Sequence, residues 1–83
     1  MRNRVIVKAV LGGLSKPEQG SGQRELKVAP GETGLMYWVV VEHFRSPEPR
    51  VIWDTDPARV PRTVLLQEVE VIGIERNGRR MQV

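Results

Sequence analysis

The stretch Leu35 to Phe44, LMYWVVVEHF, is the most apolar segment of the chain and decides the kind of fold that it can adopt. β-Branched and aromatic residues such as these favour extended strands. Successive side chains of a strand point to opposite faces, and here both faces are apolar until the last residues. We therefore expect a central strand that packs on both sides.

Four further segments carry the pattern of a strand. Arg4 to Leu11 is rich in β-branched residues, residues 23–29 alternate between polar and apolar, and Arg50 to Asp54 suits a short antiparallel return strand. Val64 to Glu75 also alternates, but its apolar positions change from odd to even numbers along the segment. A bulge or bend near Gly73 would reconcile its two halves.

The sharpest local signal is Asn77-Gly78, which predicts a two-residue hairpin because these residues readily supply the two positive φ angles of a type I′ turn. Counting outward from the turn places Ile74 opposite Met81 on an apolar face, and we expect this pair to be buried. The same register pairs Arg76 with Arg79, Glu75 with Arg80, Gly73 with Gln82 and Ile72 with Val83.

Turn-forming residues separate the strands. Residues 12–22 hold four Gly, one Pro and two Ser, a composition that predicts a flexible loop. Asp56 before Pro57 predicts the N-cap of a single helical turn, which Pro61 ends. Together the segments predict one small β domain over residues 1–83. We expect an all-β, five- or six-stranded antiparallel barrel or rolled sheet, SH3-like or OB-like in shape, with at most one short helical turn.

Length and composition limit what can hold this fold together. A chain of 83 residues buries only about 60–65% of the surface that its unfolded form exposes, so the core is thin. There is no cysteine to supply a disulfide or a zinc thiolate. No apolar run approaches the roughly 18 residues of a membrane span, and the charged first residues do not resemble a signal peptide. We expect a cytoplasmic protein without membrane contact that gains stability through association.

The residue inventory argues against catalysis. The serines lie in predicted loops without the pattern of a nucleophile elbow, and His43 is the single imidazole, with no partner next to it on its own face. Asp54 and Asp56 lack the spacing of a calcium loop, and the glycines of residues 12–22 lack the lysine and helix of a phosphate loop. We therefore expect a non-enzymatic protein with no metal ion and no cofactor.

The charges are unevenly distributed along the chain. Thirteen Lys and Arg against ten Asp and Glu give a net charge of +3, with the basic residues concentrated near both ends and the acidic ones in the middle. Small β-barrels bind RNA or single-stranded DNA through a basic groove and exposed aromatic rings. This is the alternative function that the sequence allows, although a net charge of +3 is modest. The candidate residues for it are Arg2, Arg4, Lys8, Arg76, Arg79 and Arg80.

The function that the sequence favours is protein–protein association. A strand that is apolar on both faces carries more apolar surface than a thin core is expected to bury. Large exposed apolar patches usually mark interfaces. The competing explanation is that another part of the chain, such as residues 64–66, covers the second face. The interface candidates, with Trp38 or Tyr37 as the anchor, are Met36, Tyr37, Trp38, Val40 and Phe44.

The small size and the missing enzyme signature, rather than any particular residue, suggest the setting for such an association. We expect a subunit or adaptor of a larger assembly, either a homo-oligomer or a complex with another protein. A phage or viral particle is one such assembly, and the protein would then be a structural component of the virion. The residues leave open which partner is bound, and whether a bound nucleic acid would be RNA or DNA.

Overall fold

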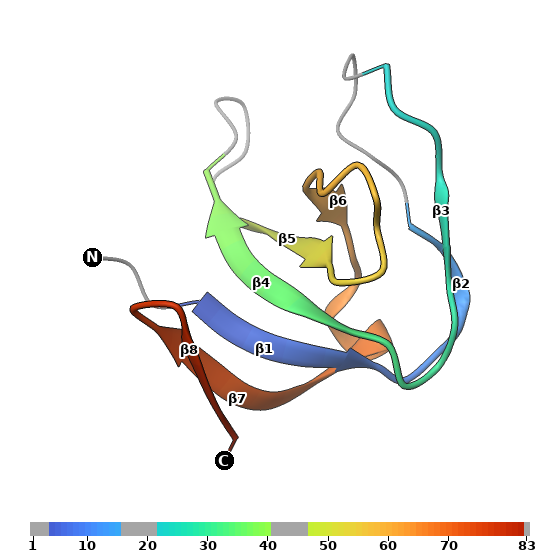
Figure 1. Cartoon of the computed structure of the whole chain (residues 1–83). Helices are drawn as coiled ribbons and strands as arrows, with labels where there is room; N and C mark the ends of the chain where they lie inside the picture. Colours follow the sequence, from blue (N-terminus) through green and yellow to red (C-terminus); the bar gives the residue numbers. More distant parts are fainter. Residues whose placement is uncertain (1–3, 16–21, 41–46, 83) are drawn as a thin grey trace.

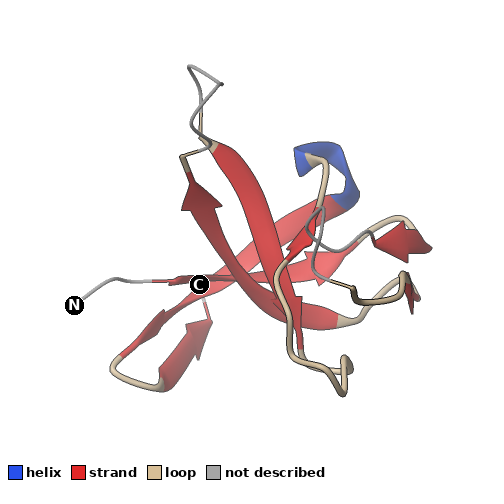
Figure 2. Ribbon diagram, turned by 90° about the horizontal axis from the view of Figure 1, so that it is seen from above, coloured by secondary structure: helices blue, strands red, loops and turns tan. Residues whose placement is uncertain are grey.

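A computed structural model describes residues 4–15, 22–40 and 47–82, which form strands and one short 3₁₀ turn (Figure 1 and Figure 2). The predicted all-β class is confirmed. No helix in the described part of the chain is long and apolar enough to cross a membrane. The strands are β1 (Arg4–Ala9), β2 (Gly13–Ser15), β3 (Leu26–Val28), β4 (Thr33–Val39), β5 (Glu48–Trp53), β6 (Arg62–Thr63), β7 (Val69–Arg76) and β8 (Arg79–Gln82), and the 3₁₀ turn is η1 (Leu66–Glu68).

Six strands form one antiparallel sheet in the order β6-β5-β4-β1-β7-β8, and β2 pairs with β3 in a separate two-stranded sheet (Figure 1). β4 lies between β1 and β5, so the prediction of a central strand in the apolar segment is confirmed. Over the described residues the larger sheet is open, with β6 at one edge and β8 at the other. Of the two predicted architectures, the strands form the rolled sheet.

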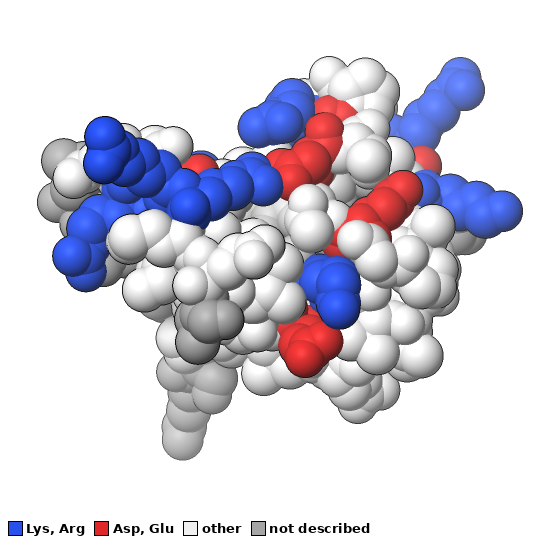
Figure 3. Space-filling view, turned by 60° about the horizontal axis from the view of Figure 1, so that its bottom comes forward, with Lys and Arg blue, Asp and Glu red and all other residues white. Residues whose placement is uncertain are grey.

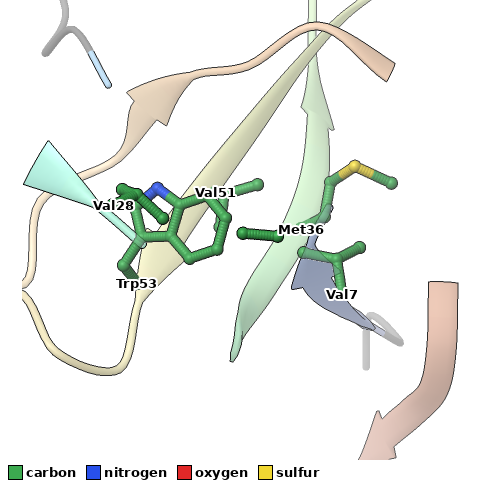
Figure 4. Packing of buried hydrophobic residues seen from close by; sticks show 6 residues of the cluster. Val7, Val28, Met36, Val51 and Trp53 are labelled. Carbon is green, nitrogen blue, oxygen red and sulfur yellow. The ribbon is translucent and has the colours of Figure 1, made fainter. Parts of the chain in front are cut away.

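One face of the larger sheet, here called the core face, carries the main hydrophobic core. Val51 and Trp53 of β5 are 0% and 2% exposed, and Met36 of β4 lies directly opposite Val51. Val28 of β3 packs onto them from the smaller sheet, and Figure 4 shows the Trp53 indole beside Val28 and Val51. Burying each such side chain contributes about 1.5–3 kcal/mol. Residues 64–66 were named above as a competing cover for the apolar strand, and of these Val64 packs against this cluster.

The core face crosses all six strands but is covered unevenly. The first three residues of one row across the sheet are buried, the next two are half-buried, and the last, Met81, is 46% exposed. The expected buried pair of Ile74 and Met81 is therefore wrong for Met81, because β8 is an edge strand. The row consists, from β6 to β8, of Arg62, Val51, Met36, Val5, Ile74 and Met81.

The opposite face holds a smaller apolar pair, Ile6 and Leu35, which are directly opposed and 3% and 6% exposed. Arg80 of β8 lies on this face, and its guanidinium donates two hydrogen bonds of 2.7 Å to the carboxylate of Asp54, just after β5. Four interstrand steps separate β5 from β8. In a flat sheet these steps would span about 19 Å, farther than the two side chains can reach. The sheet is therefore strongly coiled around Ile6 and Leu35.

Two features of β7 permit this coiling. The pairing of β7 with β1 shifts by one residue, which leaves Ile72 between Val71 and Gly73 without a directly opposed residue. Such a bulge bends a strand and increases its twist. At Gly73 the two strands of the hairpin approach so closely that a Cβ atom would collide with the carbonyl oxygen of Met81. The predicted bulge near Gly73 is confirmed.

The hairpin between β7 and β8 is also confirmed. Asn77 and Gly78 have φ angles of 53° and 80°, as a type I′ turn requires. The pair of Ile72 with Val83 involves a residue outside the described part of the chain. The predicted register holds in full for the other pairs, Arg76 with Arg79, Glu75 with Arg80, Ile74 with Met81 and Gly73 with Gln82.

The strand predicted over Val64 to Glu75 is too long. β7 begins at Val69, and the three residues before it form η1. The Glu68 carboxylate accepts a hydrogen bond of 2.9 Å from the Leu65 amide and so closes the turn. Apolar character alone suggested a strand here, whereas Leu65 and Leu66 are 60% and 54% exposed.

Part of the segment 12–22, which was predicted to be a flexible loop, forms a strand that pairs with β3. Gly13–Ser15 forms β2 against Leu26–Val28, so the first third of that segment belongs to a sheet. No sequence pattern indicated this strand, because it is short and begins with glycine. Residues 16–21, on which the rest of the prediction depends, lie outside the described part.

The helical turn predicted after Asp56 is not formed. The Asp56 carboxylate does cap the chain locally, because it accepts hydrogen bonds from the amides of Ala58 at 2.9 Å and Val60 at 3.4 Å. Arg59, however, has a φ of 54°, a left-handed conformation that a right-handed helix cannot include. Asp56 therefore caps a turn and not a helix.

The close approach at Gly73 predicts the cost of adding a side chain there. Gly73→Ala should lower the free energy of unfolding by about 1–3 kcal/mol, since the new Cβ must push against backbone atoms of β8. Gly13→Ala is the matched control, because a Cβ at that position meets no atom within 4 Å. Its effect should stay within about 0.5 kcal/mol. Urea unfolding measures the stability of both variants. Equal stabilities would contradict the close approach of β7 and β8 at Gly73.

Candidate functional site

The described residues contain no cluster of metal-ligating side chains and enclose only a small hollow. No group of three or more His, Cys, Asp or Glu residues among them is placed to hold a metal ion. A hollow of about 20 Å³ lies beside Trp53, between β3, η1 and the start of β7. This volume suits roughly one water molecule, whereas small-molecule sites measure about 300–1,000 Å³. The hollow is therefore too small for such a ligand.

Apart from Val40, which follows β4, the exposed large apolar side chains of the described residues lie in two regions. At one end of the sheet Val10 and Leu11 follow β1, and their amides donate to the carbonyl oxygen of Glu68 in η1, which brings Leu65 and Leu66 nearby. This group is entirely aliphatic. The second region lies on the core face toward β8, where burial fades. Its exposed members are Trp38, Val71 and Met81.

The second region is built by strand register. Met36 is opposed to Val5 and Val5 to Ile74, so β4, β1 and β7 present this row side by side, and Met81 extends it onto β8. Trp38 lies two residues beyond Met36 on the same strand and therefore on the same face. Its indole is 46% exposed, in contrast to the fully packed Trp53.

Two arginines border this apolar region. Arg76 lies two residues beyond Ile74, Arg79 lies two residues before Met81, and the two arginines are directly opposed, so both share the face of Trp38. Within residues 4–15, 22–40 and 47–82 neither forms an ion pair. Figure 3 shows Lys and Arg side chains gathered on the side where Figure 1 places the β7–β8 turn. We call the group Trp38, Ile74, Met81, Arg76 and Arg79 the Trp38 surface.

The structure divides the predicted interface residues. Met36 is 4% exposed and belongs to the core, so its assignment to an interface is wrong: Val51 and Val5 flank it on the sheet. Trp38 and Val40 are 46% and 80% exposed and remain candidates. Phe44 lies outside the described residues.

Tyr37 points to the other face of β4 from Trp38. It is half-buried, and the guanidinium of Arg4 lies 5.4 Å from the centre of its ring. A cation at this distance from an aromatic face is attracted by about 0.5–1 kcal/mol at exposed sites. Tyr37 is therefore a structural partner of Arg4, and of the two proposed anchors Trp38 is the exposed one.

The predicted basic residues do not form one cluster. Lys8 lies 3.7 Å from the Glu70 carboxylate and Arg80 is held by Asp54, so both are paired with acids. Lys8, Arg80 and Arg4 lie on the face of Ile6, opposite to Arg76 and Arg79. Arg2 lies outside the described residues.

The pair of Arg80 and Asp54 was not recognised in the sequence, since 26 residues separate the two. The hydrogen bonds from Arg80 hold the pKa of the Asp54 carboxyl below its ordinary value of 3.8, against the effect of burial, and the Thr33 hydroxyl adds a bond of 2.7 Å. The same pairing raises the pKa of Arg80. Arg80 is thus a structural residue that keeps the sheet coiled.

A second ion pair is buried at the β6 edge. Arg62 donates a hydrogen bond of 2.9 Å to Asp56, and the two side chains are 4% and 1% exposed. Burial raises the pKa of the Asp56 carboxyl, but the bonds from Arg62 and from the amides of Ala58 and Val60 outweigh it and hold that pKa below 3.8. Arg62 also donates to the carbonyl oxygen of Arg24 and so joins the β6 edge to the segment before β3.

The Arg80–Asp54 pair predicts a pH-dependent contribution to stability. Because folding lowers the pKa of Asp54, its contribution should be complete above the unfolded-state pKa near 3.8 and disappear as the pH falls through the folded-state value. Asp54→Asn should therefore cost about 0.5–1 kcal/mol near pH 7, a modest value because the pair is partly exposed, and much less near pH 2. Urea unfolding at both pH values measures this.

The control for this prediction is Glu70→Gln, which removes the longer and more exposed contact with Lys8. Its effect near pH 7 should be smaller than that of Asp54→Asn. If Asp54→Asn destabilises equally at both pH values, the ionised carboxylate is not the source of the stability.

Comparison with known proteins adds no information on this site. No protein-family model, curated protein or solved structure matches the chain.

Proposed function

We propose that the chain is a non-enzymatic protein-association module, a subunit or adaptor of a larger assembly, and that it binds through the Trp38 surface. The observation that carries this proposal is an indole 46% exposed on the same sheet face as two arginines without an ion pair in the described structure. The apolar Met81, 46% exposed, lies on that face as well.

The composition of this surface matches that of protein interfaces. Aromatic residues, Met and Arg are enriched at interfaces, and Trp and Arg account for a large share of the residues whose truncation costs more than about 2 kcal/mol. The aliphatic group at the other end, Val10, Leu11, Leu65 and Leu66, consists of residue types that are under-represented among such hot spots. This contrast favours the Trp38 surface.

The packing of the core supports the same choice. Trp53 is 2% exposed and fills the core together with Val51 and Val28, so Trp38 is not needed there. A large aromatic side chain that is half exposed on a small domain loses apolar contact with water when a partner covers it. Because the core does not depend on Trp38, this side chain is available to bind a partner.

Truncation of the indole tests the proposal. Trp38→Ser should weaken association by about 2 kcal/mol or more, roughly 30-fold in Kd, while the circular-dichroism spectrum stays unchanged. Association is measured as mass by light scattering for the chain alone, and as retention of a co-purifying partner on the immobilised chain.

Leu65→Ser is the matched control, since Leu65 is 60% exposed at the other end of the sheet. It should leave association unchanged. Loss of association with Leu65→Ser and not with Trp38→Ser would assign binding to the aliphatic end. A wild-type chain that stays monomeric and retains no partner would refute the proposed function itself.

A second candidate is the binding of single-stranded nucleic acid. The observation in its favour is that Trp38, on which a base could stack, shares its face with Arg76 and Arg79, which could contact phosphates. Against it, the acid-paired Lys8 and Arg80 are unavailable for that role. Two arginines supply little of the electrostatic attraction on which such binding depends.

Titration with a labelled single-stranded oligonucleotide near physiological salt separates the two functions. Under the association proposal the Kd should be no tighter than the roughly 10⁻⁴–10⁻⁶ M of non-specific binding. The double variant Arg76→Glu, Arg79→Glu would abolish binding by a nucleic-acid module. Tight oligonucleotide binding that this variant abolishes would replace association with the second candidate.

A further inference from the structure

β8 offers a second element of recognition beside the Trp38 surface. Among the described residues it is the last strand of the sheet and pairs with β7 alone, and all four of its residues are exposed. The other edge strand, β6, has two residues, and the first of them is buried with its side chain bonded to Asp56. An exposed edge presents unpaired amides and carbonyls that another extended chain can bond.

The register determines which main-chain groups of β8 point outward. In a two-residue hairpin the residues next to the turn, here Arg76 and Arg79, form a hydrogen-bonded pair, and bonded and non-bonded pairs alternate from there. The amides and carbonyls of Arg79 and Met81 are therefore directed to β7. Those of Arg80 and Gln82 face the open edge.

The side chains of β8 determine what kind of strand fits that edge. On the core face, an added strand would place two alternate residues beside Arg79 and Met81. Arg79 has no acidic partner in the described structure, and Met81 is 46% exposed. The complementary strand has an acidic residue next to Arg79 and, two residues away, an apolar residue next to Met81.

We propose that the open edge of β8 pairs through main-chain hydrogen bonds with an extended segment of the partner protein whose alternate residues are acidic and apolar. This inference rests on the proposed function, since it describes how the same partner would be held beside the Trp38 surface. The added strand extends the sheet by one strand. The alternating side chains of that segment then lie next to Arg79 and Met81.

A second copy of the chain fits this edge less well. β8 has the sequence Arg-Arg-Met-Gln, which contains no acidic residue. A second β8 would offer no carboxylate to Arg79, which has no acidic partner in the described structure, and like charges across a strand pair are destabilising. The charge of Arg79 also disfavours basic strands, so it provides selectivity for an acidic segment.

A synthetic probe can test strand addition without the natural partner. The probe is a blocked peptide of two Thr-Glu-Thr-Val units, and its control has Lys in place of Glu. Binding of the acidic peptide should slow amide hydrogen exchange at Arg80 and Gln82 at least tenfold. The amides of Arg79 and Met81, already bonded to β7, should change much less. The Lys peptide should bind at least tenfold more weakly.

A pair of variants at one position supplies the second arm. Gln82→Pro removes an outward amide that β7 does not use, whereas Gln82→Ala keeps it. Gln82→Pro should weaken binding of the acidic peptide at least tenfold, and Gln82→Ala should bind like the wild type. If Gln82→Pro fails to fold, the exchange experiment on the wild type decides.

Several outcomes would overturn this inference. They are equal binding by both Gln82 variants, peptide binding without protection of Arg80 and Gln82, and equal binding of the Lys peptide. Protection of these amides by the chain alone at high concentration would identify a second copy as the occupant. None of these results contradicts the proposed function if Trp38→Ser still weakens association. Failure of strand addition and failure of the proposed function are therefore distinguishable.

Discussion

The close approach of β7 and β8 at Gly73 is the constraint on which the rest of the structure depends. With no side chain at Gly73 and one extra residue at Ile72, β7 bends enough for Arg80 to reach Asp54 across four interstrand steps. That coil encloses Ile6 and Leu35 on one face and leaves the β8 end of the core face uncovered. The Trp38 surface exists because the sheet bends away from it.

Local signals in the sequence predicted much of this fold. Asn77-Gly78 determines its own turn through positive φ angles, and alternation then determines the register of the hairpin. The apolar segment from Leu35 identified the central strand, and the parity change in β7 identified the bulge. Each of these features depends on residues close together in the sequence.

Features that depend on distant residues escaped prediction. The bond from Arg80 to Asp54 and the one from Arg62 to Asp56 are set by tertiary structure, and Arg80 was taken for a nucleic-acid contact because its acid lies 26 residues away. Burial was misjudged for the same reason. Alternation assigns Met36 and Trp38 to one face, but only the fold shows that the first is 4% exposed and the second 46%.

Oxidative footprinting would test the central claim most directly, because Trp and Met side chains react readily with hydroxyl radicals where water reaches them. The isolated chain and its assembled form are exposed to radicals and compared by mass spectrometry. Our account predicts that oxidation of Trp38 and Met81 falls several-fold in the assembled form while Leu65 and Leu66 react as before. Unchanged oxidation of Trp38 and Met81, with protection of Leu65 and Leu66, would contradict it.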